Sequence, residues 1–172
     1  MASMTGRGSD MIMFEEEFAQ IKQAISRLRI DANAKMVFLV DRNGQQIAAQ
    51  GELDGVDVTS LASLTAGNVA ATDALARLLG EKEFSGIFHE GLKDNLHISV
   101  VGDRVILVIV FDDRSSLGLV RLRVKKATQE LNRIFDEIMK KSERDKETLD
   151  AAGFESPFAE ITDEDIDSLF SE

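Results

Sequence analysis

Apolar residues recur at steps of three and four in two long stretches, one near each end of the chain. Between Phe14 and Ala32 the apolar positions are Phe14, Phe18, Ile21, Ile25 and Leu28. Between Leu117 and about Lys146 they are Leu117, Val120, Val124, Ala127, Leu131, Ile134 and Ile138. This spacing is typical of amphipathic helices, whose apolar stripe packs on another element. We therefore predict a helix in each stretch.

Shorter segments have the composition of strands, rich in apolar and β-branched residues. They are residues 35–41 (KMVFLVD), 46–51 (QIAAQG), 84–90 (FSGIFHE), 95–101 (NLHISVV) and 104–112 (RVILVIVFD). An Asn-Gly pair follows the first segment and Gly102-Asp103 precedes the last, so we predict a hairpin at each place. The short loop after Glu90 also permits only an antiparallel return. The strands therefore form an antiparallel sheet.

The places of the strands in the sheet follow from their polarity. Segments 35–41 and 104–112 are apolar at successive positions, so both of their faces are covered and they lie at the centre. Segments 46–51 and 84–90 are shorter and mixed in polarity, as edge strands are. A helix between the two hairpins, which we call the central helix, completes the order α-β-β-α-β-β-β-α. The expected fold class is α/β, of the α+β type, with a five-stranded antiparallel sheet between helices on both of its faces.

The central helix is predicted from Asp57 or Thr59 to Leu79, with either residue as N-cap and Gly80 as the stop. At 100° per residue we expect one side to face the sheet, made of Leu61, Leu64, Asn68, Ala71, Leu75, Leu78 and Leu79. The opposite side holds a ladder of alanines flanked by Val69, Asp73 and Arg77, namely Ala62, Ala66, Ala70 and Ala74. Asp73 is the only charged residue from Thr59 to Ala76. We interpret this uncharged side as an interface; the alternative is that alanine, a strong helix former, merely fills surface positions.

Three stretches, "FLVDRNGQQIA", "TSLASLTAGNVAATDALARLLG" and "SLGLVRLRVKKATQEL", together resemble the Roadblock / dynein light chain family. The resemblance runs from about Phe14 to Lys141, and "SPFAEITDEDIDSLFSE" is similar to the tail of a subgroup of bacterial polarity regulators. The resemblance implies a homodimer joined through the central helix and the strand 84–90. The implied interface residues are Ala62, Val69, Phe84, Ile87 and Phe88.

The same resemblance implies a partner, a Ras-like small GTPase that sits on the paired helices of two regulator subunits and hydrolyses GTP faster there. Such regulators act in cell polarity and gliding motility, and can be concentrated at a cell pole. The implied GTPase-binding residues are Ala66, Ala70, Asp73, Ala74, Arg77, Lys126 and Arg133. Ala19 and Gln20 depart from the hydroxyl and base of the family pattern, so a contact by the first helix stays open.

No catalytic residue is expected in this chain. Arg77, Arg114 and Arg121 are the arginines placed to enter a GTPase site, but the family implies activation by rearranging the GTPase's own catalytic groups. We therefore expect a regulatory protein, not an enzyme, with no essential arginine. Two alternatives stay open: a noncatalytic scaffold that tethers a GTPase or motor, and a regulator that also promotes nucleotide exchange through its tail.

Composition narrows the remaining chemistry. The chain has no cysteine, which excludes disulfides and thiolate metal sites, and its two histidines, His89 and His97, have no acidic partners at a metal-site spacing. Neither a Gly-x-Gly-x-x-Gly nor a Walker motif is present, so no cofactor is expected. The net charge of −11 does not suit a nucleic-acid partner. The longest apolar run, Val105 to Phe111, is too short to enter a membrane, and we expect a cytoplasmic protein.

The ends of the chain differ from its body. Residues 1–10 resemble an expression leader; residues 11–141 form the predicted domain, 142–153 a polar linker and 154–172 an acidic tail. The tail has seven Asp and Glu and no Lys or Arg. Its apolar residues are Phe154, Phe158, Ile161, Ile166, Leu169 and Phe170. We predict that the tail becomes helical on binding the GTPase, the alternative being that it folds back on its own dimer.

Overall fold

The computed structural model of the protein describes residues 14–153. The elements are α1 (Glu15–Asp31), β1 (Met36–Asp41), β2 (Gln46–Gly51), α2 (Val58–Leu78), β3 (Ile87–His89), β4 (Asn95–Val101), β5 (Val105–Phe111) and α3 (Leu117–Ala151). The five strands form one antiparallel sheet in the order β2-β1-β5-β4-β3. The predicted fold class is confirmed, with β1 and β5 inside the sheet and β2 and β3 at its edges.

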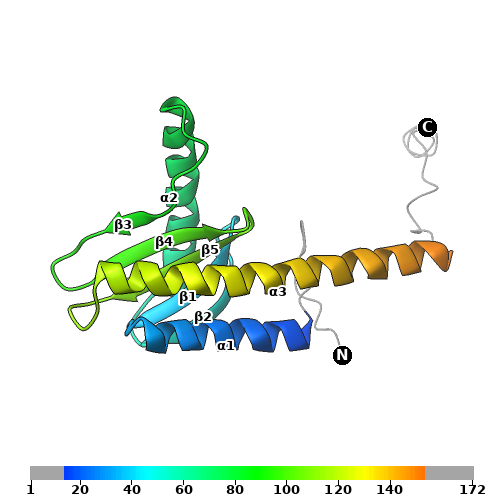
Figure 1. The fold of residues 1–172 in the computed structure, drawn as a ribbon, viewed down its shortest axis with the longest axis horizontal. Coiled ribbons are helices and arrows are strands. Elements are labelled where there is room, and N and C mark those ends of the chain that lie inside the picture. The colour runs from blue at the N-terminus through cyan, green and yellow to red at the C-terminus, as the bar shows by residue number, and fades with distance from the viewer. Residues whose placement is uncertain (1–13, 154–172) are drawn as a thin grey trace, which may run out of the picture.

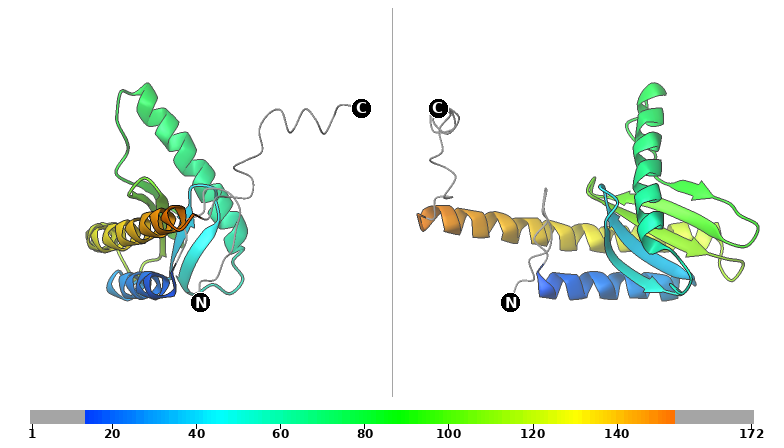
Figure 2. Two further views of the ribbon diagram at one scale, coloured as in Figure 1. Left: turned by 90° about the vertical axis from the view of Figure 1, so that its right-hand side faces the viewer. Right: turned by 180° about the vertical axis from the view of Figure 1, so that it is seen from behind.

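Helices α1 and α3 cover one face of the sheet, and α2 lies on the other (Figures 1 and 2). Successive residues of a strand point to opposite faces, so each central strand feeds two cores. Val37 and Leu39 belong to the core under α1 and α3, whereas Phe38 and Val40 belong to the core on the α2 side. This division explains why β1 and β5 are apolar at nearly every position.

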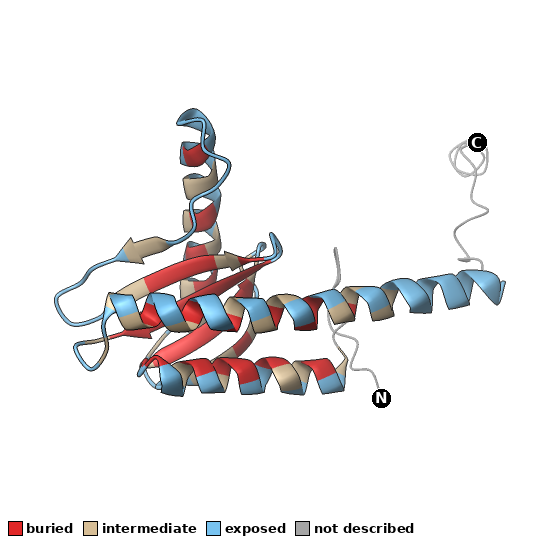
Figure 3. Cartoon of the chain, viewed as in Figure 1, coloured by how far each residue is buried: buried red, intermediate tan, exposed pale blue. Residues whose placement is uncertain are grey.

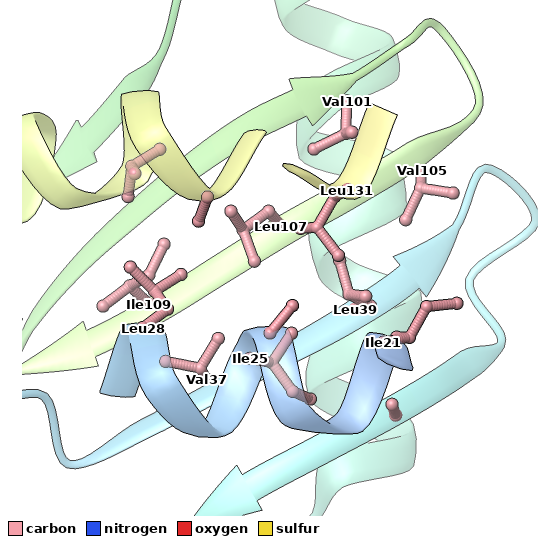
Figure 4. Close-up of a cluster of buried hydrophobic side chains, with 14 of the residues drawn as sticks. Ile21, Ile25, Leu28, Val37, Leu39, Val101, Val105, Leu107, Ile109 and Leu131 are labelled. Atoms are coloured by element: carbon pink, nitrogen blue, oxygen red, sulfur yellow. The ribbon is translucent and has the colours of Figure 1, made fainter. Parts of the chain in front are cut away.

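The core under α1 and α3 is the larger of the two clusters. Ile21 and Ile25 of α1 and Leu131 of α3 are buried in it with Leu39 of β1 and Leu107 of β5 (Figure 4). The apolar stripes predicted for both helices therefore face the sheet. No helix within residues 14–153 is long and apolar enough to cross a bilayer.

Helices α1 and α3 run antiparallel, and an ion pair joins them at each of two places along their length. Arg27 Nη1 lies 3.1 Å from Glu130 Oε2. Near the start of α1, Lys141 of α3 donates a hydrogen bond to Glu17, whose side chain is shielded by the surrounding packing. The hydrogen bond from Lys141 lowers the pKa of Glu17 below its ordinary value, and it raises the pKa of Lys141.

Helix α3 is longer than its apolar stripe. It continues to Ala151 and stops before Gly153, whose φ is +72°. Residues 142–151, predicted to belong to a polar linker, are therefore helical. Their sequence SERDKETLDA contains neither Gly nor Pro, so nothing breaks the helix after the last core contact. From Glu143 onward the helix is exposed and extends past the sheet (Figure 3).

The orientation predicted for α2 is wrong. Its buried residues are Ala62, Thr65, Val69 and Ala76, none of which was expected to face the sheet. Leu64, Leu75, Leu78 and Leu79, expected to face the sheet, are between 55% and 83% exposed. Small side chains let the helix lie close to the sheet, and the leucines point outward. Because both sides of α2 are apolar, the helical period alone could not decide which one packs inward.

Candidate interaction surface on helix α2

Helix α2 is anchored at its start by a cap and by a close approach of the β1–β2 turn. Asp57 Oδ1 accepts a hydrogen bond from the Ser60 backbone N–H at 3.0 Å, and the Ser60 hydroxyl donates to Asp57 Oδ2 at 2.6 Å. These bonds lower the pKa of Asp57. Gly44 in the turn has φ +87°, and a Cβ there would lie 3.0 Å from Ser63 Cα. Glycine at this position therefore lets the turn contact the helix.

Arg42 fixes the middle of α2. Its Nη1 donates to Asp73 Oδ2 at 2.9 Å, and its Nε donates to the backbone oxygen of Asp103 at 2.8 Å. One guanidinium thus links the β1–β2 turn, α2 and the β4–β5 turn. Asp73, predicted to contact the GTPase, is half-buried and engaged in this intrachain pair.

Two exposed strips run along the outer side of α2. The leucine strip consists of Leu64, Ala71, Leu75, Leu78 and Leu79. Beside it, the alanine strip consists of Ala70 and Ala74, with Arg77 at its end and Ala66 half-buried at its start. Neither strip carries an acidic side chain. Of the α2 residues predicted to bind the GTPase, Ala66, Ala70, Ala74 and Arg77 thus lie together, whereas Asp73 is held by Arg42. The leucines, predicted to face the sheet, lie beside them on the outer side.

The predicted dimer residues fall into two groups. Ala62 and Val69 are 0% and 2% exposed and belong to the chain's own core, so they are corrected from interface to core. Phe84, Ile87 and Phe88 lie at or just before the edge strand β3 and keep part of their surface open. Phe88 stacks on Phe111 with ring centroids 6.2 Å apart.

Lys126 and Arg133 do not join this surface. Both are exposed on the outer side of α3, which covers the opposite face of the sheet from α2 (Figure 2). Arg133 Nη1 lies 4.0 Å from Glu137 Oε1 on the same helix. Sequence spacing could not place the two helices on opposite faces, because that depends on how the strands connect.

The three candidate arginines lie on different elements of the fold. Arg77 ends the alanine strip, and Arg121 lies on the outer side of α3. Arg114 follows β5 and donates to Asp112 at 2.9 Å and to Glu52 at 3.4 Å, and these acids raise its pKa. Through these two acids, Arg114 joins the ends of β2 and β5.

The histidines have different surroundings. His89 is exposed, with its Nε2 at 3.4 Å from the Asn68 amide nitrogen. His97 is buried under α3, and burial together with nearby Arg121 lowers its pKa. Across residues 14–153, no three His, Asp or Glu side chains gather closely enough to hold a metal ion.

The chain matches a known domain family and several solved structures. Residues 20–111 match the model of the Roadblock/LC7 domain. MglB of Myxococcus xanthus is 59% identical with a TM-score of 0.70, over 74% of this chain and 96% of that chain. No curated protein sequence matches the chain.

Two further solved structures of MglB proteins are also similar to the chain. Gliding protein MglB of Thermus thermophilus is 34% identical with a TM-score of 0.68, over 73% of this chain and 95% of that chain. An MglB structure with a tetrameric arrangement is 32% identical with a TM-score of 0.69, over the same shares. The chain therefore belongs to the Roadblock/LC7 family and is similar to the MglB proteins within it.

Proposed function

We propose that this protein is a homodimeric regulator of a Ras-like small GTPase of the MglA type, and that it stimulates GTP hydrolysis in cell polarity and gliding motility. The observation that carries the proposal is the outer side of α2, which is apolar, exposed and free of acids in the described chain. The 59% identity to MglB of Myxococcus xanthus supports the choice of partner.

The leucine strip supports the dimer. An exposed row of leucines on a single chain is costly in water, because each leucine gains roughly 1.5–3 kcal/mol when it is buried. A second copy that lays its own α2 on the strip buries the leucines of both copies at once, as twofold symmetry requires. Edge strand β3 then meets its counterpart and extends the sheet across the dimer.

The alanine strip supports the GTPase contact. With the leucines taken by the second copy, Ala70 and Ala74 stay open beside the dimer axis. Their small side chains allow a partner to approach the helix backbone closely. Two copies present two such strips side by side, which matches two regulator subunits for one GTPase.

Activation follows from selection of one GTPase conformation. A partner that binds one arrangement of the GTPase switch segments more tightly than another shifts the population toward it. Arg77 is the one candidate arginine on the proposed contact surface. We expect hydrolysis to depend on the GTPase's own catalytic groups, so that Arg77→Ala weakens stimulation by only a few-fold instead of the roughly 10³-fold loss of a missing arginine finger.

The test is a GTP-hydrolysis time course with the purified GTPase, with and without this protein. Ala70→Arg is expected to abolish stimulation, because a long charged side chain holds the partner off the helix. Leu149→Arg, on the exposed end of α3, is the control and should stimulate normally. Full stimulation by a folded Ala70→Arg dimer would contradict the assignment of the surface.

The same assay separates the two alternatives. GTPase binding without faster hydrolysis would select a noncatalytic scaffold that tethers a GTPase or motor. Faster release of labelled GDP would select the other alternative, a regulator that also promotes nucleotide exchange through its tail. The tail residues Phe154, Phe158, Ile161, Ile166, Leu169 and Phe170 lie outside the described residues.

A further inference from the structure

The outer side of α3 carries a concentrated positive charge that the proposed function does not use. From Leu117 to Gln129 the helix has four basic residues and no acidic one. Three of them are exposed on one side, Arg121, Lys125 and Lys126, and Arg133 follows two turns later. We call this side, with Leu122 and Gln129 between the bases, the basic face.

The basic face has almost no partners of its own. Within residues 14–153, Arg121, Lys125 and Lys126 form no salt bridge, and Arg133 has only the 4.0 Å contact with Glu137. The first turn of α3 contains no acid either. No acid on this part of α3 therefore offsets these bases, and an anionic segment placed there would gain charge pairs with them.

An apolar side chain lies among these bases. Leu122 is 63% exposed in the middle of the basic face. A purely ionic ligand would leave Leu122 uncovered. An acidic segment with apolar residues could pair with the bases and also cover this leucine. Such a segment is present in the chain itself: residues 154–172 have seven acids, no base, and a row of Ile and Phe residues.

The reach of the tail permits this contact. Helix α3 ends at Ala151. The distance back along the helix from there to Lys126 is about 37 Å at 1.5 Å per residue. The acids of residues 160–167 follow Gly153 by 7 to 14 positions, so an extended chain carries them about 23 to 46 Å back along the helix, a range that includes Arg133, Lys126 and Arg121. The tail can therefore turn at Gly153 and lie along the outer side of the helix that precedes it.

We infer that the basic face of α3 is the docking site of the chain's own acidic tail. The acids of residues 160–167 pair with Arg121, Lys125, Lys126 and Arg133, and apolar tail residues cover Leu122. The contact is on the opposite face of the sheet from α2, so it leaves the alanine strip open. It holds the tail on its own subunit until a competing surface binds it. This inference stands independently of the GTPase proposal.

Cross-linking in the full-length chain tests the inference, because the sequence contains no cysteine. The variant Gln129→Cys/Thr162→Cys places one thiol on the basic face and one at the tail position expected to lie beside it. The matched control is Gln23→Cys/Thr162→Cys, in which the first thiol lies on exposed α1 beside Lys22 and Arg27. Under mild oxidation we expect a disulfide within one chain at least about tenfold faster for the Gln129 variant.

Charge reversal then tests the cause. Adding Lys125→Glu/Lys126→Glu to the Gln129 variant should slow cross-linking about tenfold, since two attractions become repulsions. Reversal of two exposed bases elsewhere, Lys93→Glu/Arg104→Glu, should leave the rate unchanged. Raising the salt from about 0.05 M to about 0.5 M should slow the Gln129 variant as well.

Several outcomes would overturn the inference. Equal or faster cross-linking at Gln23 would place the tail beside α1. Disulfides found only between chains, as dimer bands on a non-reducing gel, would show that the tail does not return to its own helix. A rate that is insensitive to Lys125→Glu/Lys126→Glu in a variant with unchanged circular dichroism would mean that the basic face does not hold the tail.

Discussion

Helices α2 and α3 lie on opposite faces of the same sheet and use their apolar residues in opposite ways. The stripe of α3 is buried, with Leu131 and Ile138 fully enclosed, while the charges point to solvent. In α2 the small residues Ala62 and Val69 are buried and the leucines point outward. Helix α3 therefore buries its large apolar residues within one chain, whereas α2 packs on the sheet through small residues and leaves its leucines exposed.

This difference shows what an amphipathic pattern can and cannot tell. In α3, charged residues mark the outer side, so the inward side follows directly from the helical period. In α2, neither side is strongly charged, and the larger residues are on the side that faces away from the chain's own sheet. The positions of large apolar residues on a helix therefore do not by themselves tell which side packs within one chain.

The largest expected effect is in the core under α3. Leu131→Ala removes a fully buried side chain and should lower the free energy of unfolding by about 3 kcal/mol. Asp136→Ala, five residues later on the exposed side, should change it by less than about 0.5 kcal/mol. Urea unfolding followed by circular dichroism measures both. Similar losses for the two variants would break the contrast between the two sides of α3.

Substitutions in the leucine strip of α2 should weaken dimerisation, not the stability of the single chain. Leu75→Asp/Leu78→Asp leaves the intrachain core intact but puts two carboxylates into the proposed dimer contact, and should raise the dimer dissociation constant on the order of 100-fold. Analytical ultracentrifugation measures the dissociation constant. Leu149→Asp, at an exposed leucine of α3, serves as the control and should dimerise normally. A double variant that stays dimeric at low micromolar concentration would show that the strip does not join two copies.

Much of the fold followed from sequence because strand and helix patterns were consistent with one another. The strict alternation in β1, with Val37 and Leu39 on one side and Phe38 and Val40 on the other, required cover on both faces. Gly102-Asp103 marked the last hairpin, and both residues adopt positive φ, at +57° and +58°, as a two-residue type I′ turn requires.

The parts of the site that sequence missed depend on tertiary arrangement. The pairing of Arg42 with Asp73 joins residues 31 positions apart, which no local pattern indicates. The separation of Lys126 from Ala70 depends on which face of the sheet each helix covers. The end of α3 was misplaced because its last ten residues lose their core contacts while keeping good helix formers, and composition suggested a linker.

A smaller effect should distinguish the two helix caps. Ser116 Oγ accepts from the Leu119 N–H at 3.2 Å, whereas α2 has a carboxylate cap at Asp57. Ser116→Ala should lower stability by about 1 kcal/mol, since an N–H of the first turn loses its acceptor. Ser116→Asp keeps an acceptor and adds a negative charge beside the base-rich start of α3, so it should be at least as stable as the unsubstituted chain. Thermal unfolding measures both, and a loss in Ser116→Asp equal to that in Ser116→Ala would contradict the capping role.

The smallest effect concerns how α3 is held to α1, and it depends on pH. Lys141 keeps the pKa of Glu17 below its ordinary 4.5, so the ionised carboxylate stabilises the folded chain. This contribution is fully present above about pH 4.5 and is lost as the pH falls through the lowered folded pKa. Glu17→Gln should therefore be less stable than the unsubstituted chain at about pH 7, and the difference should shrink as the pH falls below 4.5. Urea midpoints between about pH 3 and pH 7 measure it, with Glu15→Gln, an exposed acid of the same helix turn, as the control. A difference that stays constant across that range would mean that the packing of Glu17, and not its charge, joins the two helices.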